Sequence, residues 1–394
     1  MLGLQSRVDS KTASEALNLF KTKFPDYANS ELYYGVAPGR IEILGNHTDY
    51  NEGFILSAAI DKCTVLIGSK TTDRNVTLHS ESMNASITFS LDDDTKYSVE
   101  SGSSWANYPK GVIRELKPAT GFVGVFKSNI PVGGGVSSSA AIELATAMLL
   151  RSLYPELEQD TMKLILACKK AENDFVGMGC GVLDQYTSGM GRVGHLVSLD
   201  CRDIFKHCYI PLCPEVKFVI ANSLAPHQLV DGKYNILRAQ CFDAAALLGV
   251  PFLRDVSLDR FDREKSVLPE GVRNTASHIV NENDRVLRGV KMLAEGDVDG
   301  FGALMSLSHQ SSTRDFGNSC PELDTLVACA TGLQGCLGSR LMGGGFGGCT
   351  ISLVRSEEGE IFCSALLQAY HDHTGISTTA FVVSAGDGAT GGLL

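Results

Sequence analysis

The chain has 394 residues, of which 44% are hydrophobic and 20% are charged, so it can bury a sizeable core and is expected to fold as two domains. Its 34 Lys and Arg residues against 45 Asp and Glu residues give a net charge of −11. A surface this acidic repels nucleic acid and anionic membranes. The charge therefore excludes both as expected partners, and any anionic ligand must be held by local groups.

No stretch of the chain predicts a membrane segment. The residues MLGLQSRVDSKTASEAL lack the charged-then-apolar pattern of a signal peptide. The most apolar helical run, AAIELATAMLL, has 11 residues and includes Glu143, which is far short of a bilayer span. None of the twelve cysteines sits in a Cys-x-x-Cys spacing, so buried or free thiols are expected rather than zinc ligands or disulfides. We therefore expect a cytoplasmic protein.

Strands dominate the first third of the chain. Apolar residues at helical spacing predict an opening helix over residues 11–24. Strand-like segments follow at residues 33–36, 41–44, 63–68, 76–80 and 123–126.

The rest of the chain mixes helices with short strands. Helices are predicted over residues 137–154, 161–175, 235–248, 272–295 and 322–331, and strands over 195–199, 217–222, 349–354 and 380–384. This pattern is neither a regular βα alternation nor a run of strands alone, and it favours an α+β protein of two layered lobes. Short strands, Cys and Pro crowd residues 200–215, so we place the lobes at residues 1–205 and 206–394.

A glycine-rich loop, IPVGGGVSSSAAIE, is the sharpest local signal, because it stands directly before a strongly helical run. Glycines let the backbone approach a ligand closely, and a helix N-terminus offers free N–H groups to an anion. An ordinary Ser-capped helix is the alternative, but a cap does not require three glycines and three serines. The loop therefore favours phosphate binding, although it is not a Walker A loop.

A second glycine cluster, LMGGGFGGCTISLV, formally matches a dinucleotide-binding fingerprint. That fingerprint needs a helix after it, and here a β-rich run follows at Cys349, so the Rossmann interpretation fails.

Two acidic residues, Glu172 and Asp184, occupy positions that suggest a role in metal binding or catalysis. Glu172 shares an apolar helical stripe with Ile165 and Cys168, where it is either a metal ligand beside the phosphate loop or a surface residue paired with Lys169. Asp184 lies in the glycine-punctuated segment GMGCGVLDQYTSGMG, which is either a plain turn or the place of an acid that accepts a proton from an attacking hydroxyl.

Three segments in order, APGRIEILGNHTDYNEG, IPVGGGVSSSAAIE and LMGGGFGGC, resemble the galactokinase branch of the small-molecule kinases that also include homoserine, mevalonate and phosphomevalonate kinases. The segments CGVLDQY, DGKYNILRAQC, SHIVNENDR and NSCPELDTLV add to this resemblance, which covers nearly the whole chain. It implies an N-terminal α+β lobe, a ferredoxin-like C-terminal lobe and an active site between them. It also implies ATP as co-substrate and Mg²⁺ as cofactor. We expect a monomer.

The resemblance further implies roles for individual residues. Asp184 matches the catalytic acid that acts on the sugar C1 hydroxyl, and Arg40 matches the arginine that stabilises charge between phosphate and nucleophile. The implied magnesium ligands are Ser139 and Glu172. The implied nucleotide contacts are Gly133, Gly134, Gly135, Val136, Ser137, Ser138, Ser139 and Trp105. The implied sugar contacts are Asn46, His47, Thr48, Asp49, Gly181 and Tyr234.

One departure from the family pattern concerns the sugar-binding segment. The family usually reads Arg-x-Asn-x-x-Gly-Glu-His, whereas this chain has Glu42 and Asn46 at the two exchanged positions. The family's Glu contacts the C6 side of the sugar, so we expect Asn46 to weaken discrimination at C6. Glu42 is not expected to replace that Glu, because four residues of extended chain span about 13 Å.

The resemblance predicts a sugar 1-kinase that phosphorylates galactose at C1 with ATP. A kinase for a C6-altered analogue such as galacturonate is one alternative. A non-catalytic galactose and ATP sensor is another, but such sensors are altered in the Ser-Ser-Ser-Ala region, which is intact here at residues 137–140. The intact segment favours the enzyme.

Overall fold

The computed structural model describes residues 4, 8, 10–131, 134–204, 206–225 and 230–394. Its larger sheet has eight strands: β12, β1, β2, β5, β3 and β4 pair in that order, and β6 joins β2 to β7. All pairs are antiparallel except β3 with β5. The strands are β1 (Tyr33–Leu44), β2 (Phe54–Lys70), β3 (Asn75–Ser80), β4 (Ala85–Ser90), β5 (Phe122–Ser128), β6 (His195–Asp200), β7 (His207–Pro211) and β12 (Thr390–Leu393).

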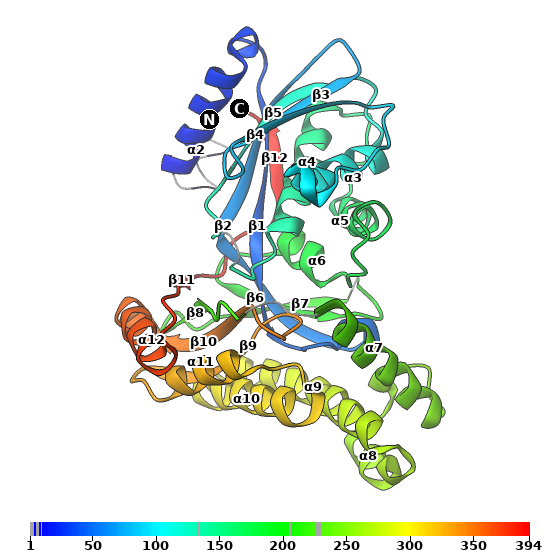
Figure 1. Cartoon of the computed structure of the whole chain (residues 1–394), viewed down its shortest axis with the longest axis vertical. Helices are drawn as coiled ribbons and strands as arrows, with labels where there is room; N and C mark the ends of the chain where they lie inside the picture. The colour runs from blue at the N-terminus through cyan, green and yellow to red at the C-terminus, as the bar shows by residue number, and fades with distance from the viewer. Residues whose placement is uncertain (1–3, 5–7, 9, 132–133, 205, 226–229) are drawn as a thin grey trace.

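Helices cover both faces of the upper part of this sheet (Figure 1). On one face, helix α2 buries Phe20 in a cluster with Val65 and Ile67 of β2. Leu66, which points to the opposite face because side chains alternate along a strand, packs in the core formed with the other helices. These helices are α3 (Asn107–Leu116), α4 (Ser138–Leu153), α5 (Thr161–Lys170) and α6 (Leu183–Met190), and α2 spans Ser10–Lys23.

A second, four-stranded antiparallel sheet has the order β11-β8-β10-β9. Along the chain, one strand is followed by helices, then by two strands, a helix and a last strand. When these four strands are numbered along the chain, their order in the sheet is 4-1-3-2, which is that of the expected ferredoxin-like lobe. The strands are β8 (Val216–Asn222), β9 (Cys336–Leu341), β10 (Cys349–Arg355) and β11 (Ala380–Val383). The helices are α7 (Val230–Leu247), α8 (Leu258–Glu264), α9 (Glu270–Ala294), α10 (Val298–Ser311), α11 (Pro321–Thr331) and α12 (Gly359–Thr374).

The two sheets share a hydrophobic core. Phe218 and Ile220 of β8 belong to the same cluster as Ile41 of β1 and Leu56 of β2. Val219, on the opposite face of β8, packs in a cluster with residues of α11 and α12. The lower end of β1 therefore reaches the C-terminal lobe, and this contact positions the segment that follows Leu44 between the lobes.

The expected fold class, an α+β protein of two lobes, is confirmed. Strands β7 and β12, however, come from the part assigned to the C-terminal lobe and pair in the larger sheet, so sheet membership does not change at one point of the chain. The division at residues 205 and 206 stays a prediction.

Most predicted elements lie where the sequence placed them, with one difference that matters for the site. The two short strands expected at 33–36 and 41–44 are one continuous strand, β1. The twelve cysteines form no disulfide. Among the described residues, no helix is long and apolar enough to cross a bilayer.

Candidate active site

A tight loop follows β1 and contains most of the expected sugar contacts. It turns at Gly45, whose φ of +103° disfavours other residues and whose position leaves no room for a Cβ, which would lie 2.6 Å from the carbonyl oxygen of Phe54. The loop then passes through the short helix η2 (Asp49–Asn51) and returns to the sheet at β2. The turn folds residue 46 back beside the end of β1.

Helix α9 of the C-terminal lobe holds this loop through its backbone. Glu282 is fully buried, and its Oε1 accepts hydrogen bonds from the amides of Gly45 (2.9 Å) and Asn46 (3.2 Å). Burial alone would raise the pKa of Glu282, but Arg285, which binds it at 2.6 Å, and Arg340 lower it well below its usual value. The loop is therefore anchored to a buried charged group.

His47 and Thr48 serve the shape of the loop. The Nε2 atom of His47 lies 3.1 Å from the carbonyl oxygen of Gly344, which can only accept, so Nε2 carries the proton and Nδ1 accepts from the hydroxyl of Tyr50 at 2.8 Å. Burial lowers the pKa of His47 to about 4, which keeps the ring neutral. The Thr48 hydroxyl is fully buried within 2.8 Å of the carbonyl oxygen of Gly45, and Thr48 does not line the pocket described next.

A polar pocket of about 150 Å³ opens beside the loop, large enough for a monosaccharide. Residues of both lobes line it: Arg40, Glu42, Gly45, Asn46, His47, Asp49, Cys180, Gly181, Leu183, Asp184, Tyr234, Gly343 and Gly344. The structure thus brings together every expected sugar contact except Thr48 with both expected catalytic residues.

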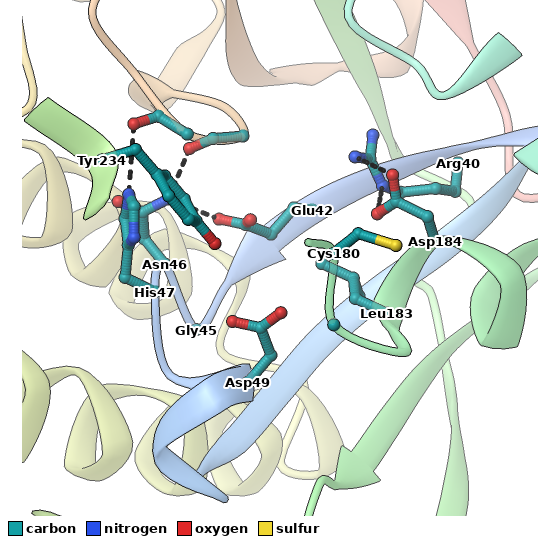
Figure 2. Close-up of a pocket in the computed structure, with 13 residues that line it drawn as sticks. Arg40, Glu42, Gly45, Asn46, His47, Asp49, Cys180, Leu183, Asp184 and Tyr234 are labelled. Carbon is teal, nitrogen blue, oxygen red and sulfur yellow. Dashed lines mark hydrogen bonds and ion pairs between the residues drawn. The ribbon is translucent and has the colours of Figure 1, made fainter. Parts of the chain in front are cut away.

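Asp49, Gly181 and Tyr234 form part of the pocket wall. A Cβ at position 181 would lie 1.9 Å from Oδ2 of Asp49, so only glycine lets the carboxyl group take its place there. Burial raises the pKa of Asp49 to about 6. The ring of Tyr234, from α7, lies over that of His47 with centroids 5.2 Å apart (Figure 2).

Arg40 and Asp184 form a bidentate ion pair at one end of the pocket (Figure 2). Nε of Arg40 donates to Oδ1 of Asp184 at 2.8 Å and Nη2 donates to Oδ2 at 2.9 Å. Nη1 of Arg40 reaches the carbonyl oxygen of Gly135 at 3.0 Å, and the hydroxyl of Ser137 also donates to Oδ2 of Asp184. The expected catalytic acid is therefore in direct contact with the glycine-rich loop.

The glycine-rich loop leads directly into α4, as the sequence predicted. Ser137 is the N-cap residue with a left-handed φ of 53°, and its side chain bonds Asp184 instead of capping the helix. The first N–H groups of α4 therefore remain available to an anion. Gly135 and Ser138 are exposed, and Gly134 and Val136 are buried. Gly133 lies outside the described residues.

The two expected magnesium ligands lie side by side beyond this loop. Glu172 is 6% exposed, in a π-helical turn (Ala171–Val176) that continues α5, and the Ser139 hydroxyl hydrogen-bonds its carboxyl group. The alternative of a surface residue paired with Lys169 is thereby excluded. Glu143 is fully buried nearby, and its Oε1 has no hydrogen-bond partner among the described residues. Burial, together with the neighbouring carboxylates, raises the pKa of both Glu143 and Glu172.

Trp105 lies apart from the polar pocket. Its ring packs edge-on against Phe126 with centroids 6.2 Å apart, beside the core under α3 and α4. Its indole N–H is buried and has no partner among the residues described. Its expected contact with the nucleotide stays a prediction.

The geometry of Glu42 and Asn46 corrects one expectation. Their side chains were expected to lie far apart, yet Nδ2 of Asn46 donates to Oε1 of Glu42 at 3.1 Å. The estimate was wrong because it assumed an extended chain, whereas the chain turns at Gly45. Glu42 also forms a buried ion pair at 3.1 Å with Arg340 of β9, in the other lobe.

Sequence reasoning assigned no role to several residues that shape the site. Glu282 lies in SHIVNENDR and Gly343 and Gly344 lie in LMGGGFGGC, two segments noted for their resemblance only. Arg340 precedes the glycine cluster, and no sequence motif marks it as functional. These residues act through long-range contacts that a linear sequence does not display.

Comparisons with known proteins agree with this geometry. Three family descriptions match: "Galactokinase galactose-binding signature" over residues 18–70, "GHMP kinases N terminal domain" over 107–192 and "GHMP kinases C terminal" over 290–372. The galactokinase of Roseiflexus sp. (strain RS-1) is 40% identical over 361 residues, which cover 89% of this chain and 91% of the relative. The galactokinase of Homo sapiens is 37% identical over 397 residues and 99% of both chains.

Solved structures extend the comparison to three dimensions. The structure of Lactococcus lactis galactokinase complexed with galactose matches with a TM-score of 0.88 and 33% identity, over 95% of this chain and 99% of that chain. A mevalonate kinase structure, at 17% identity and a TM-score of 0.62, shares the fold. The chain belongs to the galactokinase family of the GHMP kinases.

Proposed function

We propose that this enzyme transfers the γ-phosphoryl group of ATP to the C1 hydroxyl of galactose. The observation that carries the proposal is the contact of Asp184 with both Arg40 and Ser137. This contact joins the sugar-sized pocket to the loop that precedes α4, so an acid and a cation stand where a sugar hydroxyl and a phosphate would meet. Phosphoryl transfer asks a protein mainly for such alignment and for positive charge around the transferred group.

The reaction needs one proton acceptor and one aligned nucleophile. The C1 oxygen forms a bond to the γ-phosphorus, the bond from that phosphorus to the β,γ-bridging oxygen breaks, and ADP leaves. Asp184 orients the C1 hydroxyl and takes up its proton. Arg40, which already bridges Asp184 and the carbonyl oxygen of Gly135, stabilises charge that develops between nucleophile and phosphate.

The nucleotide phosphates are proposed to lie against the glycine-rich loop and the N-terminus of α4. Ser139 and Glu172 are the proposed Mg²⁺ ligands, and two adjacent oxygen donors suit a metal that substrate phosphates and water complete. The raised pKa values of Glu143 and Glu172 fit a place where a cation is needed. When bound, Mg²⁺ would neutralise charge on the phosphates.

The test is a sugar panel with ATP and Mg²⁺, scored by ADP release and by ³¹P NMR of the product. Galactose should yield galactose 1-phosphate, and glucose should be phosphorylated poorly. A product phosphorylated at another hydroxyl would contradict the role of Asp184. Light scattering and cell fractionation test the monomeric state and the cytoplasmic location that belong to the same proposal.

A further inference from the structure

The carboxyl group of Glu42 has one engaged oxygen and one open oxygen. Oε1 accepts hydrogen bonds from Asn46 Nδ2 and from both Nη1 and Nη2 of Arg340, each at 3.1 Å. Oε2 accepts no hydrogen bond from any described residue, and Glu42 lines the pocket. Figure 2 shows this carboxyl group directed into the space beside the tip of Tyr234. A buried carboxylate oxygen left open toward a polar pocket is suited to accept a ligand hydroxyl.

The amide of Asn46, in contrast, is already satisfied by the protein. Its two N–H donors are used by Glu42 and by the carbonyl oxygen of Gly343 at 2.6 Å. Its Oδ1 accepts from Nδ2 of Asn318 at 2.9 Å, and the residue is 1% exposed. Asn46 therefore has no donor to spare for a sugar.

The position of Glu42 on β1 indicates which part of a sugar it meets. Arg40, Ile41 and Glu42 pair in regular register with Ala59, Ala58 and Ser57 of β2. Side chains two residues apart on a regular strand share a face at about 7 Å spacing. Arg40 holds Asp184, the proposed partner of the C1 hydroxyl, so Glu42 stands about one pyranose ring away from that end.

We propose that Glu42, held in place by Arg340, is a specificity-determining residue that accepts a hydroxyl on the C4–C6 side of the sugar. Asn46 is then a positioning residue that acts through Glu42. This inference rests on the proposed function of the same pocket. A carboxylate at this place repels a sugar acid, so galacturonate is a poor substrate.

The test compares galactose with 4-deoxygalactose and 6-deoxygalactose in the wild type and in Glu42→Gln. The kcat/KM for galactose should fall roughly 10- to 100-fold, as expected for loss of a hydrogen bond to a charged group. One of the two deoxy sugars lacks the hydroxyl in question, and its kcat/KM should change by less than about threefold. A deoxy sugar that is not turned over is measured by its Ki against galactose.

Two further variants separate recognition from folding. Glu42→Gln leaves Arg340 without its counter-charge, which can destabilise the protein. Glu42→Asp keeps the charge and withdraws the carboxylate by one methylene, so it should show the same substrate-dependent pattern. Asn46→Ser removes one of the hydrogen bonds to Oε1 of Glu42, so it should show the same substrate-dependent pattern with a smaller loss.

The outcomes test the role of Glu42 separately from the proposed function of the enzyme. Equal losses for all three sugars in both Glu42 variants, or no loss for galactose, would overturn the role of Glu42. A selective effect in Asn46→Ser alone would assign recognition to Asn46 instead. If the wild type phosphorylates none of the sugars, the proposed function itself fails.

Discussion

The buried histidine that holds the sugar loop makes the stability of the enzyme depend on pH. His278 is fully buried in α9, with Nδ1 3.0 Å from Oγ of Ser311 and Nε2 3.2 Å from the carbonyl oxygen of Asn46. Burial lowers its pKa from 6.5 to about 3. Because the folded pKa lies below the unfolded one, the unfolded chain binds a proton between pH 6.5 and about 3 that the folded chain does not.

The sign and size of the effect follow from this difference. The stabilisation is fully present above pH 6.5 and is lost at about 1.4 kcal/mol per pH unit as the pH falls toward 3. At pH 5 the loss is about 1.5 pH units, or about 2 kcal/mol. His278→Gln keeps a hydrogen-bonding side chain but cannot be protonated in the unfolded chain. Its free energy of unfolding should therefore fall by about 2 kcal/mol less than that of the wild type between pH 7 and pH 5.

Urea unfolding at the two pH values measures this difference. Trp105 is the single tryptophan, so its fluorescence reports on one site, and the circular dichroism of the chain is a second probe. Unfolding curves that coincide for the two probes indicate a single transition. His371→Gln, on the exposed surface of α12, controls for the substitution itself and should follow the wild-type pH dependence. Identical pH dependence in His278→Gln and the wild type would refute the buried neutral histidine.

Three single substitutions and one double exchange test the proposed chemistry. Asp184→Asn should lower kcat by roughly 100-fold or more while calorimetry still detects galactose binding; near-normal kcat would remove Asp184 from the mechanism. Glu172→Gln should raise the Mg²⁺ concentration for half-maximal rate and be partly rescued by excess Mg²⁺, and an unchanged requirement would contradict its role as a ligand. Because burial raises the pKa of Asp49 to about 6, the KM for galactose should rise roughly tenfold per unit below that pH, and Asp49→Asn should abolish this slope. The double exchange of Glu42→Asn with Asn46→Glu should retain more galactose turnover than either single change, since residues in contact are coupled; additive losses would count against the coupling.

Local sequence patterns predicted the elements that carry the site, because apolar periodicity and turn residues act over a few residues. The glycine-rich loop and the helix after it lie as expected, and β8 and β10 begin within one residue of their predicted starts. Strand β12, residues 390–393, has a weak pattern and forms only by pairing with β1, more than 350 positions earlier in the chain. Pairing over such a distance is fixed by tertiary packing, which the local pattern does not contain.

The roles of Arg340 and Glu282 could not be predicted for a related reason. Each is a charged residue whose burial is possible only because a partner arrives from elsewhere in the chain: Glu42 for Arg340, and Arg285 with two loop amides for Glu282. In the sequence both are charged residues like many others. Their function is set by desolvation and by the partners that compensate it.

The exchanged residues Glu42 and Asn46 show what a linear motif can and cannot transfer. Read along the chain, the family pattern is broken at two positions. In three dimensions the turn at Gly45 places the two side chains in contact, so one carboxyl group and one amide still occupy the same corner of the pocket. Arg340 approaches that corner and binds Oε1 of Glu42, which leaves the other carboxylate oxygen open toward the pocket. Sugar recognition in this part of the pocket therefore depends on Glu42, Asn46 and Arg340 together. Motif position alone would assign the role of the family's Glu to Asn46, although the carboxylate oxygen that is open to the pocket belongs to Glu42.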